Sequence, residues 1–149
     1  MNVILNVLWF VLGGFVAGLA WLLAGVIMAI TIIGLPWARS CFMLALFTFW
    51  PFGHDVISRR DFYGRSDLGT GALGTLGNII WFVLAGWWLA LMHVAAAVAL
   101  GITIIGLPFA YQHLKLALAS LAPVGKSVVS YDDTEAVLER SRSRNITPA

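Results

Sequence analysis

Thr31-Ile32-Ile33-Gly34-Leu35-Pro36 decides the fold of this chain, because the same six residues return at 103–108. Gly34 and Gly106 lack a side chain and tolerate the backbone angles that end a helix. Pro36 and Pro108 have a fixed φ and no backbone N–H, which suits the first turn of a new helix. Each copy therefore predicts a helix, a tight turn and a second helix.

The composition predicts an integral membrane protein. Hydrophobic residues make up 60% of the 149 residues and charged residues 11%, whereas soluble domains carry about 25% charged residues. Arg39 is the only charged side chain from Met1 to Gly53, and residues 68–114 contain none. No Lys or Arg precedes the first apolar run, and the run continues well beyond the roughly 15 apolar residues of a signal peptide, so we expect that the start is not a signal peptide.

The polar composition argues against several classes of site. The single cysteine, Cys41, excludes an internal disulfide, and no Cys/His cluster has zinc spacing. The sequence shows no acidic dyad, nucleophile elbow or phosphate loop. We therefore expect no enzyme activity, catalytic residue, metal or cofactor, and no nucleic-acid partner.

The repeat extends beyond the two turns. Residues 6–12 match residues 78–84 at the same offset, and Pro51-Phe52-Gly53 falls on Pro123-Val124-Gly125. Internal repeats are a common way to build membrane proteins around a pseudo-symmetry axis. The predicted organisation is a first repeat (1–61), a glycine-rich linker (62–75), a second repeat (76–133) and a partly disordered cytoplasmic tail (134–149).

Several motifs give the chain a family resemblance. They are Leu5-Asn6-Val7-Leu8, the two Ile-Gly-Leu-Pro turns, Gly86-Trp87-Trp88 followed by Met92-His93, and the Pro-x-Gly at 51–53 and 123–125. In this order they resemble the YccF family of small bacterial inner-membrane proteins, over roughly residues 1–133. The resemblance implies two copies of a two-helix membrane module and location in the inner membrane. It implies no particular activity.

The pattern predicts an all-α integral membrane fold with 2+2 spans, at residues 4–33, 36–50, 77–105 and 108–122. The long helices measure about 45 Å and the short ones about 22 Å, against a hydrocarbon core of ~30 Å. Three explanations of the short helices stay open: local bilayer thinning, a turn below the surface, and a re-entrant arm. The positive-inside rule puts the linker and both termini in the cytoplasm, so the repeats are parallel about a pseudo-twofold axis.

Polar segments follow both modules. His54–Ser58 and Lys126–Ser130 leave the membrane after Pro-x-Gly and carry β-branched residues, which predicts a two-stranded ribbon between them. Beyond it, acids followed by arginines predict a short helix capped by Asp132 or Asp133.

The helix starts after the two turns are the candidate binding sites. Unpaired N–H groups and the positive end of the helix dipole attract anions, and Arg39 lies within one turn of Pro36. The predicted pore or ion-binding residues are Thr31, Gly34, Pro36, Arg39, Thr103, Gly106, Pro108 and His93. The simpler explanation is a tight hairpin turn kept for packing, with Arg39 and Lys115 reaching lipid headgroups.

Other residues predict packing and anchoring. Gly14, Gly18, Gly86 and Gly101 have the spacing that lets helices approach closely. His93 fits either a protonation switch or a neutral hydrogen bond between helices. Trp9, Trp37, Trp50, Trp81, Trp87 and Trp88 predict an aromatic belt at the membrane surface. Asn6 and Asn78 predict helix caps or a polar vestibule.

Two functions fit these residues. One is an oligomeric ion channel or transporter that favours anions, with Arg39 at its narrow part. The other is a structural or accessory membrane protein that binds lipid headgroups or a larger partner. Four spans, two of them short, cannot enclose a pore alone, so we expect a homo-oligomer.

Overall fold

The computed structural model describes residues 1–32 and 34–146, and the chain is mostly helical. Its elements in chain order are α1 (Asn2–Trp9), η1 (Phe10–Gly14), α2 (Phe15–Ile30), α3 (Leu35–Phe49), β1 (His54–Ser58), α4 (Arg59–Tyr63), α5 (Ala72–Trp81), η2 (Phe82–Gly86), α6 (Trp87–Gly101), α7 (Leu107–Leu121), β2 (Lys126–Ser130) and α8 (Tyr131–Ile146). The apolar helical segments Asn2–Ile30 and Ala72–Gly101 are long enough to cross a membrane. The helices and turns predicted around both sextets are present.

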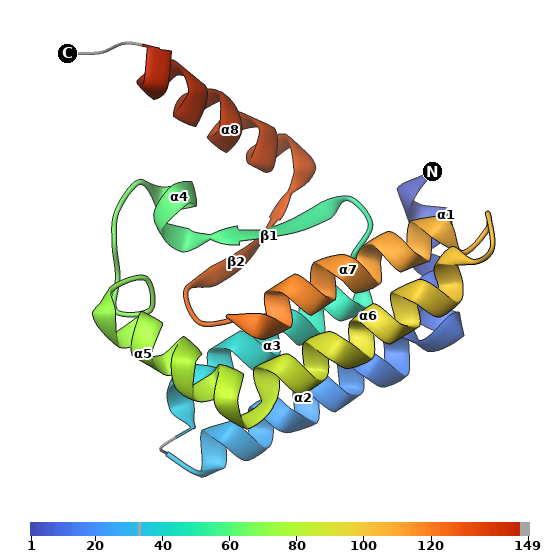
Figure 1. The fold of residues 1–149 in the computed structure, drawn as a ribbon, viewed down its shortest axis with the longest axis horizontal. Coiled ribbons are helices and arrows are strands. Elements are labelled where there is room, and N and C mark those ends of the chain that lie inside the picture. The colour runs from blue at the N-terminus through green and yellow to red at the C-terminus, as the bar shows by residue number, and fades with distance from the viewer. Residues whose placement is uncertain (33, 147–149) are drawn as a thin grey trace.

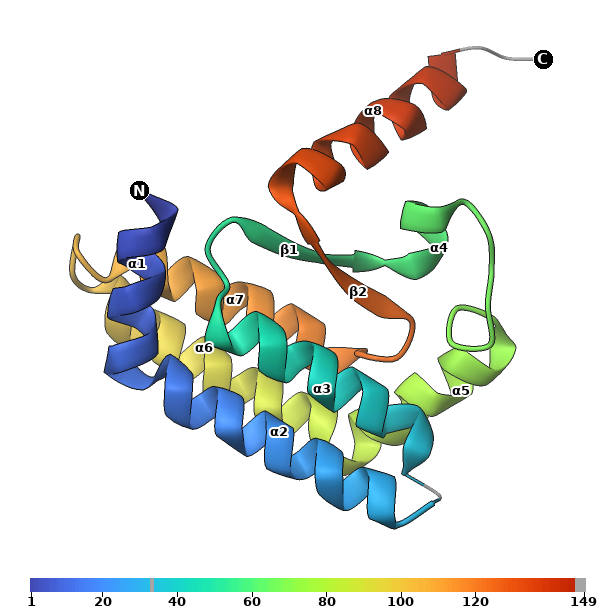
Figure 2. The ribbon, with the colours of Figure 1, turned by 180° about the vertical axis from the view of Figure 1, so that it is seen from behind.

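The long helices are not straight, which corrects the prediction of single helices of about 45 Å. A wider π-helical turn, η1 or η2, interrupts each of them and separates α1 from α2 and α5 from α6 (Figures 1 and 2). In η1, Gly13 has a φ of 154°, a backbone angle that residues with a Cβ rarely adopt. Each hairpin is therefore built of two arms of similar length, α2 with α3 and α6 with α7.

The molecule is layered. The ribbon of β1 and β2 lies on one side, α3 and α7 lie beneath it, and α2 and α6 form the layer farthest from it (Figures 1 and 2). Burial follows the same order, since α3 and α7 are rich in buried residues. By contrast, α2 buries only Gly18, Trp21 and Gly25, and α6 only Ala90 and Ala97.

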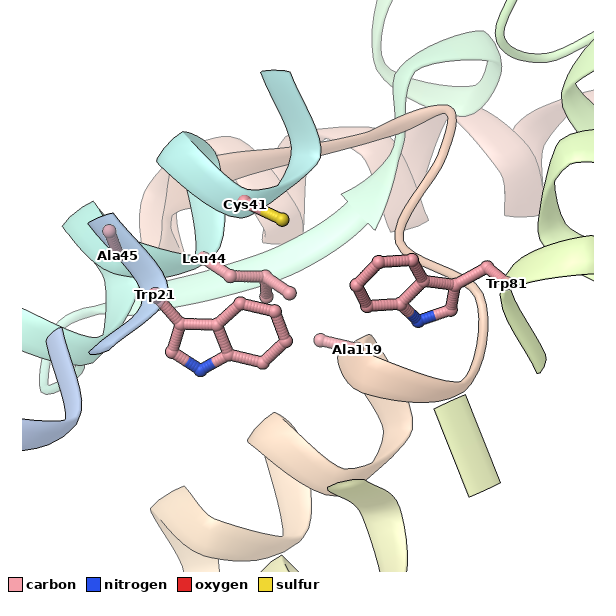
Figure 3. Packing of buried hydrophobic residues seen from close by; sticks show 6 residues of the cluster. All are labelled: Trp21, Cys41, Leu44, Ala45, Trp81 and Ala119. Atoms are coloured by element: carbon pink, nitrogen blue, oxygen red, sulfur yellow. The ribbon is translucent and has the colours of Figure 1, made fainter. Parts of the chain in front are cut away.

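Two aromatic clusters hold the halves of the chain together. In the first, the rings of Trp21 and Trp81 stack with centroids 6.3 Å apart, beside Cys41, Leu44, Ala45 and Ala119 (Figure 3). In the second, Trp9 stacks on Phe109 at 6.3 Å. Trp9 and Trp81 are 5% and 4% exposed, so the prediction that they belong to a surface belt is wrong.

The predicted ribbon is confirmed. β1 and β2 pair antiparallel, and the register sets Val56 opposite Val128. Each strand begins after a glycine with positive φ, Gly53 at 94° and Gly125 at 86°. Pro-x-Gly therefore turns the chain from α3 and α7 back over those helices.

Two asparagines fix these turns. The Asn6 amide donates to the Phe52 carbonyl and accepts from the Phe52 N–H, both at 2.9 Å. Asn78 makes the same pair of bonds to Val124, at 3.0 and 2.9 Å. The prediction that Asn6 and Asn78 cap helices or line a vestibule is therefore wrong, because both side chains bind a distant turn instead.

The tail carries the predicted helix as α8, with a different cap. The Asp133 N–H donates to the Ser130 hydroxyl at 3.2 Å, and that hydroxyl donates to the Asp133 carboxylate at 2.8 Å. Ser130 therefore caps the helix, rather than Asp132 or Asp133. The described part of the predicted tail is helical through Ile146. The disorder predicted for the end of the tail concerns residues 147–149, which lie outside the described residues.

Candidate functional site

The threonines of both turns bind the turn itself. The Thr31 hydroxyl accepts from the Gly34 N–H at 3.2 Å and donates to the Met28 carbonyl at 2.9 Å. Thr103 repeats this with Gly106 at 3.0 Å and Leu100 at 3.2 Å. A Cβ on Gly34 would lie 2.6 Å from the Met28 carbonyl oxygen, so a side chain does not fit there.

The two turns do not form one site. They lie at opposite ends of the molecule (Figures 1 and 2). Their tips are apolar, since Ile32 is 75% exposed and Ile104 is 86% exposed. Pro36 and Pro108 occupy the first turns of α3 and α7. The predicted binding residues of the two copies are therefore separate within one chain.

A cavity of about 470 Å³ lies at the start of α3, and we call it the α3–α5 pocket. Most of its wall is apolar, with two arginines. It is lined by Leu35, Pro36, Trp37, Arg39, Ser40, Arg59, Leu68, Gly69, Leu73, Gly74, Leu76, Gly77, Ile80, Val124 and Gly125. The pocket thus combines residues of both repeats and of the linker, and of the predicted site residues it contains Pro36 and Arg39.

The two arginines of the α3–α5 pocket differ in their partners. Arg59 is buried and donates to both carboxylate oxygens of Asp67, at 2.8 and 3.0 Å. This guanidinium holds the pKa of Asp67 well below its usual range. Arg39 is exposed, and within residues 1–32 and 34–146 it makes no ion pair. Arg39 therefore supplies the uncompensated positive charge of the pocket.

One hydrogen bond joins the two helices beside the pocket. The Trp37 indole N–H, in the first turn of α3, donates to the Gly77 carbonyl of α5 at 3.1 Å. This contact could not be predicted from the sequence, because a tryptophan in an apolar run is equally expected at a membrane surface.

His93 has a partner that the sequence did not identify. Its Nδ1 lies 3.1 Å from Nδ1 of His113 on α7, and the His113 ring lies 4.9 Å from that of Trp9. This arrangement matches the hydrogen bond between helices that was one of the two predictions for His93. The described residues contain no group of three or more His, Cys, Asp or Glu side chains that could hold a metal ion.

Lys115 reaches the ribbon. It is 8% exposed, its ammonium donates to the His54 carbonyl, and it lies 3.6 Å from the Asp55 carboxylate and 3.2 Å from the Tyr131 hydroxyl. Lys115 thus ties the middle of α7 to the start of β1 and to α8.

The four predicted packing glycines have different neighbours. Gly14 lies against the Trp9 indole of its own helical segment, and a Cβ on Gly18 would lie 2.5 Å from the Phe49 ring of α3. A Cβ on Gly86 would meet carbonyl oxygens of α7 at 3.1 Å, whereas one on Gly101 would have its nearest neighbour at 3.8 Å.

Comparison with known proteins places the chain in a family. The model of the inner membrane component domain YccF matches residues 4–54 and again residues 76–126. Two curated relatives, both named inner membrane protein YccF, come from Escherichia coli K12 and Shigella flexneri. Each is 40% identical over 147 residues, which cover 97% of this chain and 98% of the relative. No solved structure matches the chain. Since both the family model and the relatives cover most of its length, the chain belongs to the YccF family of inner-membrane proteins.

Proposed function

We propose that this inner-membrane protein is an accessory protein that binds an anionic phospholipid in the α3–α5 pocket. The observation that carries the proposal is the unpaired Arg39 on the wall of an apolar cavity of about 470 Å³. An acyl chain fits apolar walls, and a guanidinium binds phosphate through charge-assisted hydrogen bonds. In this role the protein binds a lipid and catalyses no reaction.

The start of α3 adds to the attraction. Its first N–H groups and the positive end of its dipole favour an anion, and Pro36 and Trp37 place that end at the same pocket. Arg59 also lines the pocket, but its charge is balanced by Asp67. Arg39 is therefore the residue on which the affinity for an anionic headgroup depends most.

Arg39 also supports a second candidate, an oligomeric channel or transporter that favours anions. Because the two turns lie at opposite ends of one chain, a path past both would need two or more copies. In either proposal the linker and both termini face the cytoplasm, as the positions of Arg59, Arg60 and Arg65 favour.

The contacts that recur at the same offset support two equivalent halves. Trp9 donates to the Thr48 carbonyl at 2.6 Å and Trp81 to the Ser120 carbonyl at 2.8 Å. The predicted 2+2 arrangement of four spans stays a prediction.

The test compares lipid retention and ion flux in the same variants. Native mass spectrometry of the detergent-solubilised protein, titrated with phosphatidylglycerol or phosphatidylcholine, reports headgroup preference. Arg39→Ala should weaken phosphatidylglycerol binding by at least about tenfold, since a charge-assisted hydrogen bond contributes about 1.5–3 kcal/mol. The control Cys41→Ala, two residues away, should retain the wild-type preference.

Halide flux from liposomes separates the two candidates. Tight liposomes together with phosphatidylglycerol binding that depends on Arg39 support the accessory protein. Halide flux that Arg39→Ala reduces, with potassium excluded, supports the channel. If Arg39→Ala changes neither measurement, both proposals fail.

A further inference from the structure

We propose that the helices of the two hairpins run parallel to the membrane plane on the side of a single leaflet and do not cross the bilayer. In this placement the outer faces of α2 and α6 contact acyl chains, and the ribbon faces the cytoplasm. This placement holds whether or not the α3–α5 pocket binds a lipid.

The first support is a contact between the start of α3 and the helix α5. An arrangement of four spans would place these two segments on opposite sides of the membrane. Trp37 follows the first turn, whereas Gly77 begins the second repeat, so four spans put them on opposite sides of a hydrocarbon core of ~30 Å. In the structure the Trp37 indole donates to the Gly77 carbonyl at 3.1 Å. Arg39 and the linker-side Arg59 likewise line one pocket. Both ends of α3 therefore lie close to residues of the cytoplasmic side.

The second support is the position of the ribbon. Lys115, near the middle of α7, contacts the His54 carbonyl and lies 3.6 Å from Asp55. The ribbon therefore lies along the flanks of α3 and α7, not beyond their ends (Figures 1 and 2). If α7 stood along the membrane normal, these charged residues would lie near the bilayer centre, where a charge is strongly disfavoured.

The third support is the distribution of charge between the layers. Neither α2 nor α6 contains a charged residue, and their outward positions are apolar and exposed. Charged side chains lie instead on the ribbon, the linker, α3, α4, α7 and α8. The face formed by α2 and α6 is thus suited to hydrocarbon, and the face that carries the ribbon is suited to water.

The dimensions agree with one leaflet. The 16 residues of α2 and 15 of α6 give helices of about 24 Å, shorter than the ~30 Å core. Lying flat, a helix layer about 10 Å thick fits within a leaflet whose hydrocarbon is about 15 Å deep. The basic residues on the ribbon side, among them Arg60, Arg65 and Lys126, select the cytoplasmic leaflet.

The test measures depth along α2 in lipid bilayers. Nitroxide labels are placed at Val16→Cys, Leu23→Cys and Ile30→Cys in a Cys41→Ala background, and depth is read from collisions with oxygen and a nickel chelate. These positions are 70%, 61% and 74% exposed and lie near one helix face at seven-residue spacing. A spanning helix changes depth by about 10 Å per step, whereas an in-plane helix gives equal depths.

The outcomes separate the placements. Steps smaller than half of 10 Å along α2 support the in-plane hairpin, and larger steps overturn it. Labels shielded from both oxygen and nickel would show that protein rather than lipid covers α2, which also overturns the proposal. Leu91→Cys and Val98→Cys, both in α6, repeat the measurement in the second repeat, and Arg65→Cys in the linker is the aqueous control.

Discussion

Asn6 gives the sharpest test of how the fold is held together. It is completely buried, and its amide satisfies both the N–H and the C=O of Phe52. Asn6→Ala removes both bonds and leaves two buried backbone groups without a partner, at about 1–3 kcal/mol each. We expect a loss of about 3 kcal/mol in the free energy of unfolding, toward the lower end because neighbouring groups relax.

Asn78→Ala is the matched comparison for Asn6→Ala, because Asn78 occupies the equivalent position in the second repeat. It makes the same two bonds to Val124, but it is half-buried. Water replaces part of the lost bonding there, so Asn78→Ala should cost about 1 kcal/mol. Asn2→Ala, at an exposed position of α1, should change the unfolding free energy by less than about 0.5 kcal/mol.

The assay is equilibrium unfolding of the purified protein in mixed micelles of increasing dodecyl sulfate fraction, followed by tryptophan fluorescence and circular dichroism. The prediction rests on burial and not on bond count, because the two asparagines make equal numbers of bonds. An Asn78→Ala variant that loses as much stability as Asn6→Ala would therefore refute the reasoning. So would an Asn6→Ala variant indistinguishable from Asn2→Ala.

Two further predictions use the same assay. Gly25→Ala places a Cβ 2.6 Å from the Phe42 ring and should lower the free energy of unfolding by about 1–3 kcal/mol. In the control Gly101→Ala the nearest atom lies 3.8 Å from the new Cβ, so stability should be unchanged or higher. Equal effects of the two substitutions would contradict this packing. Arg59 lowers the pKa of Asp67, so the pair contributes its full stabilisation above the ordinary carboxyl pKa of about 3.9, and this contribution is lost as the pH falls from there toward the lowered pKa of the folded state. Asp67→Asn should flatten the acid dependence of stability, and an unchanged slope between wild type and variant would count against the interaction.

The features that sequence reasoning predicted have local causes. Gly34-Leu35-Pro36 ends one helix and starts another through backbone chemistry alone, and the structure has that turn where it was expected. The ribbon was predictable because Pro-x-Gly and the β-branched residues after it occur at equivalent positions, and the strands pair as expected.

The features that it missed depend on contacts distant in sequence. Gly13 lies inside an apolar run, so nothing distinguished its positive φ from an ordinary helical glycine. Trp9 fits a membrane surface equally well on composition, but its indole N–H finds the Thr48 carbonyl and the side chain becomes core. The pairing of His113 with His93 could not be predicted, because it depends on how α6 packs against α7. Of the candidate site, Arg39 was identified from its position after Pro36, whereas the pocket around it needed the folded chain.

The register of the ribbon has a consequence for which substitutions the two halves of the chain can carry independently. Val56 faces Val128 across the two strands, so a half-length chain would meet a second copy of itself in the same way. In such a pair of identical subunits every substitution would occur twice. Joined as one polypeptide, the halves can differ: Lys115 stands where the first half has Met43, and His113 where it has Cys41. Covalent linkage thus lets a single charge and a single histidine pair occur on one side only, without the duplicate that strict symmetry would impose.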